Sequence, residues 1–187
     1  VSAPVIREAL AGRISRARYL AFLAQAFHHV RETVPLMMAA GARLPRRLDW
    51  LRGEMVHYIE EEHGHEQWIL SDIRAAGGDA QSAAASRPLV PTDAMVAYAR
   101  DVVNQRNPVG FFGMVFVLEG TSVALALQAA DRIQQALDLP AKAMTYLRSH
   151  GTLDQQHVHH LAGILDRLDA EEDRQAVVDT ACAVFWL

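Results

Sequence analysis

The chain has 187 residues, is 51% hydrophobic and carries a formal net charge of −4. This length suits one domain, residues 1–187, with a sizeable core, and charges of both signs without a basic run argue against nucleic acid as a partner. The most apolar stretch, residues 107–130, is interrupted by Glu119, so no membrane span is expected.

Apolar residues recur with helical spacing through most of the chain, and strand-like alternation is nearly missing. Gly77 and Gly78 end a long predicted helix, and residues 79–91, rich in Ala, Ser and Pro, are predicted to form a surface loop. Seven or eight helices with short connections imply an all-α, single-domain bundle. The predicted helices cover residues 15–29, 33–42, 46–76, 92–105, 107–137, 141–149, 153–168 and 174–187.

Nine histidines gather in three places, and the most informative group lies at residues 150–157. His150, Asp154 and His157 are spaced i, i+4 and i+7, which places them within roughly 60° of one another around a helix. Two imidazoles and one carboxylate on one face suit iron or manganese better than calcium or a structural zinc site. The alternative is a polar, solvated helix face, and Gly151 weakens the helix locally.

A second group is the acidic run at residues 60–66, inside the predicted helix 46–76. Glu62 and His65 are i, i+3 neighbours, the spacing of the Glu-x-x-His motif of di-iron bundles. Glu61 shares a face with His65 nearly as well, and Glu60 with His63 forms a rival pair. His65 lies closer than His63 to the apolar side of the helix, which favours His65. The run is otherwise typical of a solvated acidic face.

The third signal is Glu119, the only charged residue between Arg106 and Asp131. A helix this apolar is predicted to be central, and an unpaired carboxylate inside it would cost several kcal/mol or become neutral. Glu119 therefore needs a cation. A metal ion is one candidate, and a buried arginine such as Arg148 or Arg132 is the other.

Together these segments supply three carboxylates and three imidazoles from three helices. Six ligands suffice to hold two metal ions and leave positions open for dioxygen or a substrate. Iron delivers the electrons that dioxygen reduction requires, whereas zinc has no redox chemistry. The predicted metal ligands and catalytic residues are Glu62, His65, Glu119, His150, Asp154 and His157.

These motifs resemble the haem-oxygenase-like di-iron oxidases, which are relatives of the TenA and PqqC families. The resemblance rests on EEEHGHEQW with Glu62 and His65, on VLEGTS with Glu119, and on HGTLDQQH. It implies a seven-helix bundle, often a homodimer, that loads two Fe(II) ions per chain, with manganese as the alternative. It also implies oxidation of a small molecule by O2. Members of the family differ over the first glutamate, so Glu61 remains an alternative to Glu62.

Three other readings stay open. One is a metal-free hydrolase or cofactor-processing enzyme of the TenA/PqqC type, and another is a non-catalytic helical protein that binds metal. In the third, His28 or His29 would ligate haem, which would leave the three-helix ligand set without a purpose. The lone Cys182 excludes an internal disulfide and favours a reducing, cytoplasmic setting. Cys182 is expected to be a buried apolar residue rather than a nucleophile.

Overall fold

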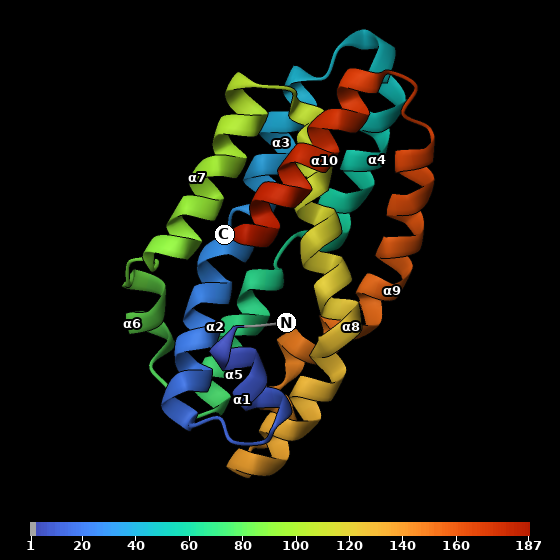
Figure 1. Ribbon diagram of the computed structural model, residues 1–187. Coiled ribbons are helices and arrows are strands. Elements are labelled where there is room, and N and C mark those ends of the chain that lie inside the picture. Colours follow the sequence, from blue (N-terminus) through green and yellow to red (C-terminus); the bar gives the residue numbers. More distant parts are fainter. Residues whose placement is uncertain (1–2) are drawn as a thin grey trace.

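The computed structural model describes residues 3–187, except for the side chains of residues 153, 154 and 156. Within that part of the chain, every regular element is helical (Figure 1). The α-helices are α1 (Pro4–Leu10), α2 (Arg16–Val30), α3 (Thr33–Arg43), α4 (Asp49–Glu62), α5 (His65–Ala75), α6 (Ala80–Ala85), α7 (Val90–Gln105), α8 (Phe111–Leu137), α9 (Thr145–Asp166) and α10 (Glu171–Trp186). Short 3-10 turns precede α4, α8 and α9, at η1 (Arg46–Leu48), η2 (Pro108–Gly110) and η3 (Ala141–Ala143).

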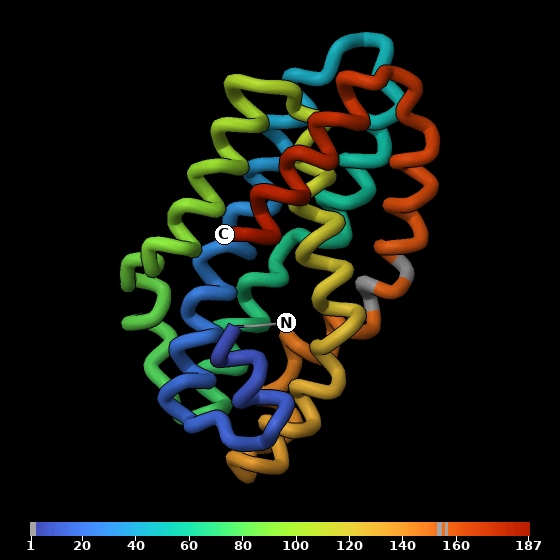
Figure 2. The backbone as a smooth tube through the Cα atoms, in the orientation of Figure 1, coloured from blue at the N-terminus to red at the C-terminus, as the bar shows by residue number. Residues whose placement is uncertain are grey.

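The all-α bundle predicted from the sequence is confirmed. If α4 and α5 are taken as one interrupted helix and the short α1 and α6 are set aside, seven helices remain among the described residues. Helix α8 runs through the middle of the bundle and packs mainly against α9 and α10 (Figure 1). The tube in Figure 2 shows α9 beside α8 along much of its length.

The long helix predicted over 46–76 is wrong in one respect, because it is broken after Glu62. His63 is extended, and Gly64 has a φ of 93°, a left-handed conformation that favours glycine. Helix α5 then starts at His65. The sequence did not reveal this break, since a single glycine inside a helical pattern is often tolerated.

The predicted loop at 79–91 contains the short helix α6. Asp79 caps it, because its carboxylate accepts hydrogen bonds from the backbone N–H groups of Gln81 and Ser82 at 2.9 and 3.1 Å. Helix α1, which the sequence did not predict, covers the end of the bundle that α2 and the second half of α8 form.

The two helices predicted over 141–149 and 153–168 are one continuous helix, α9. Its first turn is held by the buried carboxylate of Asp72 on α5, which accepts hydrogen bonds from the N–H groups of Thr145 and Tyr146 at 3.1 and 2.8 Å. Gly151 does not end α9. A Cβ at this position would lie only 2.8 Å from Cγ of Leu127 on α8, so glycine permits the two helices to approach closely.

Buried apolar side chains form two separate cores. One core joins α3, α4 and α7 to the start of α8 and the end of α9, and the other joins α1, α2 and α5 to the end of α8 and the start of α9. The boundary between the two cores therefore crosses the middle of both long helices and falls at the junction of α4 and α5. This boundary is called the seam below.

The segment Pro108–Leu137 is long and apolar enough to cross a membrane, and half of its most apolar window is buried inside the bundle. The central helix of a helical bundle passes the same test of length and hydropathy. In the bundle, this segment packs mainly against α9 and α10.

Candidate metal centre

The seam is where the predicted ligands meet. Glu62 ends α4, His65 begins α5, Glu119 lies in the middle of α8, and His150 and His157 belong to α9. Four of these side chains are buried, with relative exposures of 9% for Glu62, 4% for His65, 9% for Glu119 and 5% for His157. Titratable groups are costly in such surroundings unless they have partners of opposite charge.

The break between α4 and α5 brings Glu62 and His65 together. Nδ1 of His65 donates a hydrogen bond to Oε2 of Glu62 at 3.1 Å. The indole of Trp68 stacks on the His65 ring, with centroids 3.9 Å apart, so the imidazole is held on one side by a carboxylate and on the other by an aromatic ring. The pairing predicted from the i, i+3 spacing is present, although a turn rather than a continuous helix produces it.

Glu62 is shared between two clusters, each able to hold one metal ion. The first cluster is Glu62 with His65 and His150, and the second is Glu62 with Glu119 and His157. In each, one ligand atom from every residue lies within 4.8 Å of the others. Since a carboxylate has two oxygens, Glu62 is placed to contact a metal in both clusters, as in carboxylate-bridged pairs.

His150 is oriented by its own helix. Its Nδ1 contacts the backbone carbonyl of Tyr146 at 3.1 Å, and because a carbonyl only accepts, this nitrogen carries the proton. The lone pair is then on Nε2, the form that binds a metal. The ring also packs beside those of Tyr146 and His65, with centroids 4.6 and 5.0 Å away.

His157 joins the second cluster to the surface of α4. Its Nδ1 lies 3.4 Å from Oε1 of Glu119 and 3.8 Å from Oε1 of Glu62, while its Nε2 lies 3.2 Å from Oε2 of Glu61. Tyr58, which is fully buried, donates a hydrogen bond to the backbone carbonyl of His157 at 3.3 Å. The two ring nitrogens of His157 thus face carboxylates on opposite sides.

The two buried carboxylates of the second cluster differ in pKa. Burial raises the pKa of Glu119, the charge of Glu62 raises it further, and the hydrogen bond with His157 offsets this only in part. Burial also acts to raise the pKa of Glu62, but its hydrogen bond and charge interaction with His65 are the main contacts that reverse this and lower it. Without metal, the site therefore favours a proton near Glu119 and a charge on Glu62.

The pKa values of the two histidines on α9, His150 and His157, are shifted in opposite directions. Burial lowers the pKa of His150, so its imidazole tends to be neutral. Burial also acts to lower the pKa of His157, but the hydrogen bond and charge of Glu119, together with the other carboxylates, raise it to about 9. At neutral pH the metal-free protein therefore carries an imidazolium where a metal ion would supply positive charge.

A cation fits this set of donors. Oε2 of Glu119 is buried and has no hydrogen-bond partner among the side chains that the structure describes. The arginine alternative is not supported, since Arg148 bonds Asp131 and Gln134 instead and Arg132 is exposed. Mixed carboxylate and imidazole ligands suit iron, manganese or zinc, and a redox role selects iron or manganese.

An apolar cavity of about 280 Å³ reaches the centre. Glu62, Glu119 and His150 form part of its wall, and the rest comes mainly from apolar side chains of α1, α2, α3 and α8. Helix α1 closes one side with Val5 and Ile6. On α8, Phe111 lines the cavity, whereas Phe112 is in the core and Phe116 is half exposed.

The structure thus brings together five of the six predicted ligands. The side chain of the sixth, Asp154, lies outside the described residues. Of the adjacent glutamates, Glu62 belongs to both clusters, while Glu61 is 38% exposed and contacts His157 and His57. His63, the rival of His65, is exposed.

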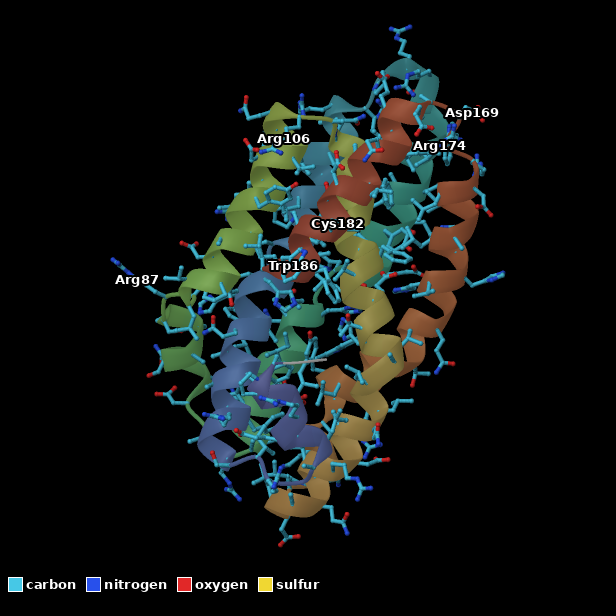
Figure 3. All side chains as sticks on the ribbon, in the orientation of Figure 1. Arg87, Arg106, Asp169, Arg174, Cys182 and Trp186 are labelled. Carbon is cyan, nitrogen blue, oxygen red and sulfur yellow. The ribbon has the colours of Figure 1, made fainter. Side chains whose placement is uncertain are left out.

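Two residues differ from their sequence-based readings. His29 lines the cavity, and burial lowers its pKa to about 4. No spacing in the sequence predicts this position for His29, because helix α2 carries none of the predicted ligands. The prediction that Cys182 is buried is wrong, since the residue is exposed on α10 (Figure 3) and does not line the cavity.

The fold and the site define a class: helical bundles that gather acids and imidazoles from three segments into two adjacent, largely buried clusters that could hold metal ions. Residues 20–187 match the family described as iron-containing redox enzymes, and the chain belongs to that family. The family model supports an iron-dependent oxidoreductase in general. No curated protein matches the chain.

Solved structures confirm the haem-oxygenase-like fold. A domain of unknown function with a heme oxygenase-like fold from Shewanella denitrificans OS217 has a TM-score of 0.87 at 25% identity, and the match covers 99% of this chain and 80% of that one. A TenA homologue from Pseudomonas syringae pv. tomato DC3000 has a TM-score of 0.72 at 13% identity, with coverages of 98% and 82%. A TenA homologue from Pyrococcus furiosus has a TM-score of 0.72 at 12% identity, with coverages of 98% and 85%.

Proposed function

We propose that the protein is a non-haem di-iron oxidase or oxygenase that activates O2 to oxidise a small organic substrate. The observation that carries this proposal is the position of Glu62, whose carboxylate belongs to two adjacent ligand clusters. Membership of a family of iron-containing redox enzymes supports iron as the metal. Bound iron would supply the electrons that reduction of dioxygen requires.

In this proposal, each of the predicted ligands would have its own role in holding the metal ions. Glu62 would bridge two metal ions, with His65 and His150 completing one site and Glu119 and His157 the other. Asp154 is proposed as a further ligand from its place in the sequence motif. The carboxylates would balance the charge of the metals, and the neutral imidazole of His150 would offer Nε2.

The volume and the apolar wall of the cavity limit the size and the polarity of the substrate. An apolar cavity of about 150 Å³ accommodates benzene, so 280 Å³ suits a molecule of about ten non-hydrogen atoms with an apolar body. Its wall is mainly apolar, and the candidate metal ligands lie at one part of that wall. A substrate seated there would present one end to the centre while its apolar part contacts α1 and α8.

Anaerobic titration with Fe(II) tests the proposal. We expect two irons per chain, and a transient visible absorption when oxygen is added. Glu62→Gln should lose affinity at both sites because the bridging charge is gone. Glu60→Gln, an exposed neighbour, is the matched control and should bind like the wild type. A wild-type protein that binds no iron, or a Glu62→Gln variant that binds two irons normally, would overturn the assignment.

The same experiment separates the alternatives. A metal-free hydrolase of the TenA type would keep its activity after chelation, and the TenA homologues share the scaffold. A storage or sensing protein would bind iron but would not couple oxygen consumption to oxidation of any compound that fits the cavity. Cys182 is exposed and does not line the cavity, so it is not placed to act as a thiol nucleophile on a substrate bound there.

A further inference from the structure

Glu61 lies outside both ligand clusters but contacts His157, a member of one of them. It precedes Glu62, which points into the seam, and its own side chain is 38% exposed. Its two oxygens contact different histidines. Oε2 lies 3.2 Å from Nε2 of His157, and Oε1 lies 3.4 Å from Nε2 of His57.

The contact with His157 is made on the side of the ring that faces away from the cluster. Nδ1 of His157 faces Glu119 and Glu62, which are its neighbours in the second cluster. Nε2 therefore lies opposite the metal side, where metal-bound histidines usually donate a hydrogen bond to a carboxylate or a carbonyl. A distance of 3.2 Å is within hydrogen-bond reach.

We propose that Glu61 is a positioning residue of the candidate metal centre: it accepts a hydrogen bond from Nε2 of His157 and so presents Nδ1 to the metal shared with Glu62 and Glu119. This inference rests on the proposed function. Glu61 is then not itself a ligand, which decides between the two glutamates that the sequence could not separate. His57, one helical turn earlier and half exposed, holds the other oxygen of Glu61 at the surface.

The arrangement has a selective consequence. His157 belongs only to the cluster with Glu119, whereas the cluster of His65 and His150 has no part in the contact with Glu61. Loss of Glu61 should therefore weaken one metal site and leave the other unchanged. A general loss of structure would affect both sites alike.

The test compares Glu61→Ala and Glu61→Gln with Glu60→Gln by anaerobic Fe(II) titration, each variant also being checked by its thermal unfolding. We expect Glu61→Ala to bind one iron with wild-type affinity and the other about 10- to 100-fold more weakly. Glu61→Gln keeps an acceptor oxygen and should recover part of that loss. Glu60→Gln should match the wild type.

Two outcomes of the titration would overturn the inference. Wild-type binding in Glu61→Ala would show that the carboxylate does not orient His157. Complete loss of one iron that excess metal does not restore, in both the Ala and Gln variants, would make Glu61 a direct ligand instead. Equal weakening of both sites would mark a general structural role and would also refute the proposal.

A measurement on the metal-free protein keeps this inference separable from the proposed function. In nitrogen-15 NMR spectra, the Nε2–H of His157 should exchange slowly with solvent in the wild type and in Glu61→Gln, and rapidly in Glu61→Ala. Rapid exchange in all three would refute the positioning role even if two irons bind. Slow exchange in the wild type without iron binding would support the contact between Glu61 and His157 and overturn the di-iron function.

Discussion

The close approach of α8 and α9 at Gly151 makes a quantitative prediction. Van der Waals contact between carbons is normally about 3.5–4.0 Å. The Cβ of Gly151→Ala would lie 2.8 Å from Cγ and 2.9 Å from Cδ2 of Leu127, and 3.3 Å from its backbone nitrogen. The side chain can rotate, but the backbone nitrogen cannot, so the helices must separate by a few tenths of an ångström.

Two opposing effects determine how much Gly151→Ala changes the free energy of unfolding. Alanine is about 0.8–1 kcal/mol better than glycine inside a helix, whereas overpacking of a close contact costs about 1–3 kcal/mol. Gly151→Ala should therefore lower the free energy of unfolding by up to about 2 kcal/mol. Gly163, on the same helix, is exposed with open space around its Cβ position, so Gly163→Ala should be stabilising by somewhat under 1 kcal/mol.

Urea unfolding of the metal-free variants, followed by circular dichroism, measures both free energies. A second readout is iron binding, because His150 and His157 flank Gly151 on α9 and must keep their spacing to Glu119 on α8. We expect Gly151→Ala to weaken iron binding while Gly163→Ala leaves it unchanged. If the two alanine variants were equally stable and bound iron equally, the close approach at Gly151 would not constrain the site.

Three further predictions concern other parts of the bundle. Gly64→Ala should destabilise the protein by about 1–2 kcal/mol in a denaturant titration, because an L-residue resists the φ of 93°. The same substitution should weaken iron binding through displacement of His65, and unchanged stability would refute this prediction. The pKa of Asp173 is lowered, because its hydrogen bonds, including that with Arg47 at 2.5 Å, outweigh the opposite effect of burial. The stabilisation of the folded state by this carboxylate is therefore present above pH ~4 and is lost as the pH falls through the folded pKa. Asp173→Asn should lower the free energy of unfolding by about 2 kcal/mol at pH 7 and leave it unchanged in strong acid, as unfolding at several pH values would show. The pKa of His157 is raised to about 9, so metal must displace its proton, and calorimetry in buffers of different ionisation enthalpy should detect proton release at pH 7 that declines above pH 9.

Much of the fold follows from the spacing of apolar residues. Helices α2, α3 and α7 lie close to their predicted bounds, since their apolar stripes and their terminal residues agree. Glu119 could be placed in the interior for an equally local reason: a single charge in a long apolar helix must find a compensating partner. Its exposure of 9% and its distance of 3.4 Å from His157 agree with that prediction.

Other features depend on the backbone and could not be predicted in this way. The break at Gly64 requires a residue in the left-handed conformation. Glycine adopts helical and left-handed conformations almost equally well, so the presence of a glycine does not show whether the helix continues or breaks. The continuity of α9 through Gly151 depends on Leu127, which lies 24 positions away on another helix. Local helix propensity at Gly151 favours an interruption, and packing against α8 overrides it.

The choice between Glu61 and Glu62 shows a different limit. Adjacent helical residues point about 100° apart, and either direction satisfied the spacing to His65. Only the tertiary arrangement separates them, because Glu62 faces the seam while Glu61 faces the edge of α4 beside His157. The same arrangement places His29 on the cavity wall, where no spacing rule relates it to the other histidines.

Because the candidate metal centre lies on the seam, polar side chains occupy positions where apolar side chains would stabilise the fold more. The two apolar cores would be continuous if the middle of α8 and α9 were also apolar, but Glu119 and His157 interrupt them there. Without metal, the cost appears as the raised pKa of Glu119, whose charge is tolerated only with help from His157, whereas the raised pKa of His157 shows that the surrounding carboxylates favour its proton. A metal ion that binds the folded state alone offsets this cost in proportion to the logarithm of its concentration over its dissociation constant. The seam is therefore the part of the bundle where metal loading and folding are most strongly linked.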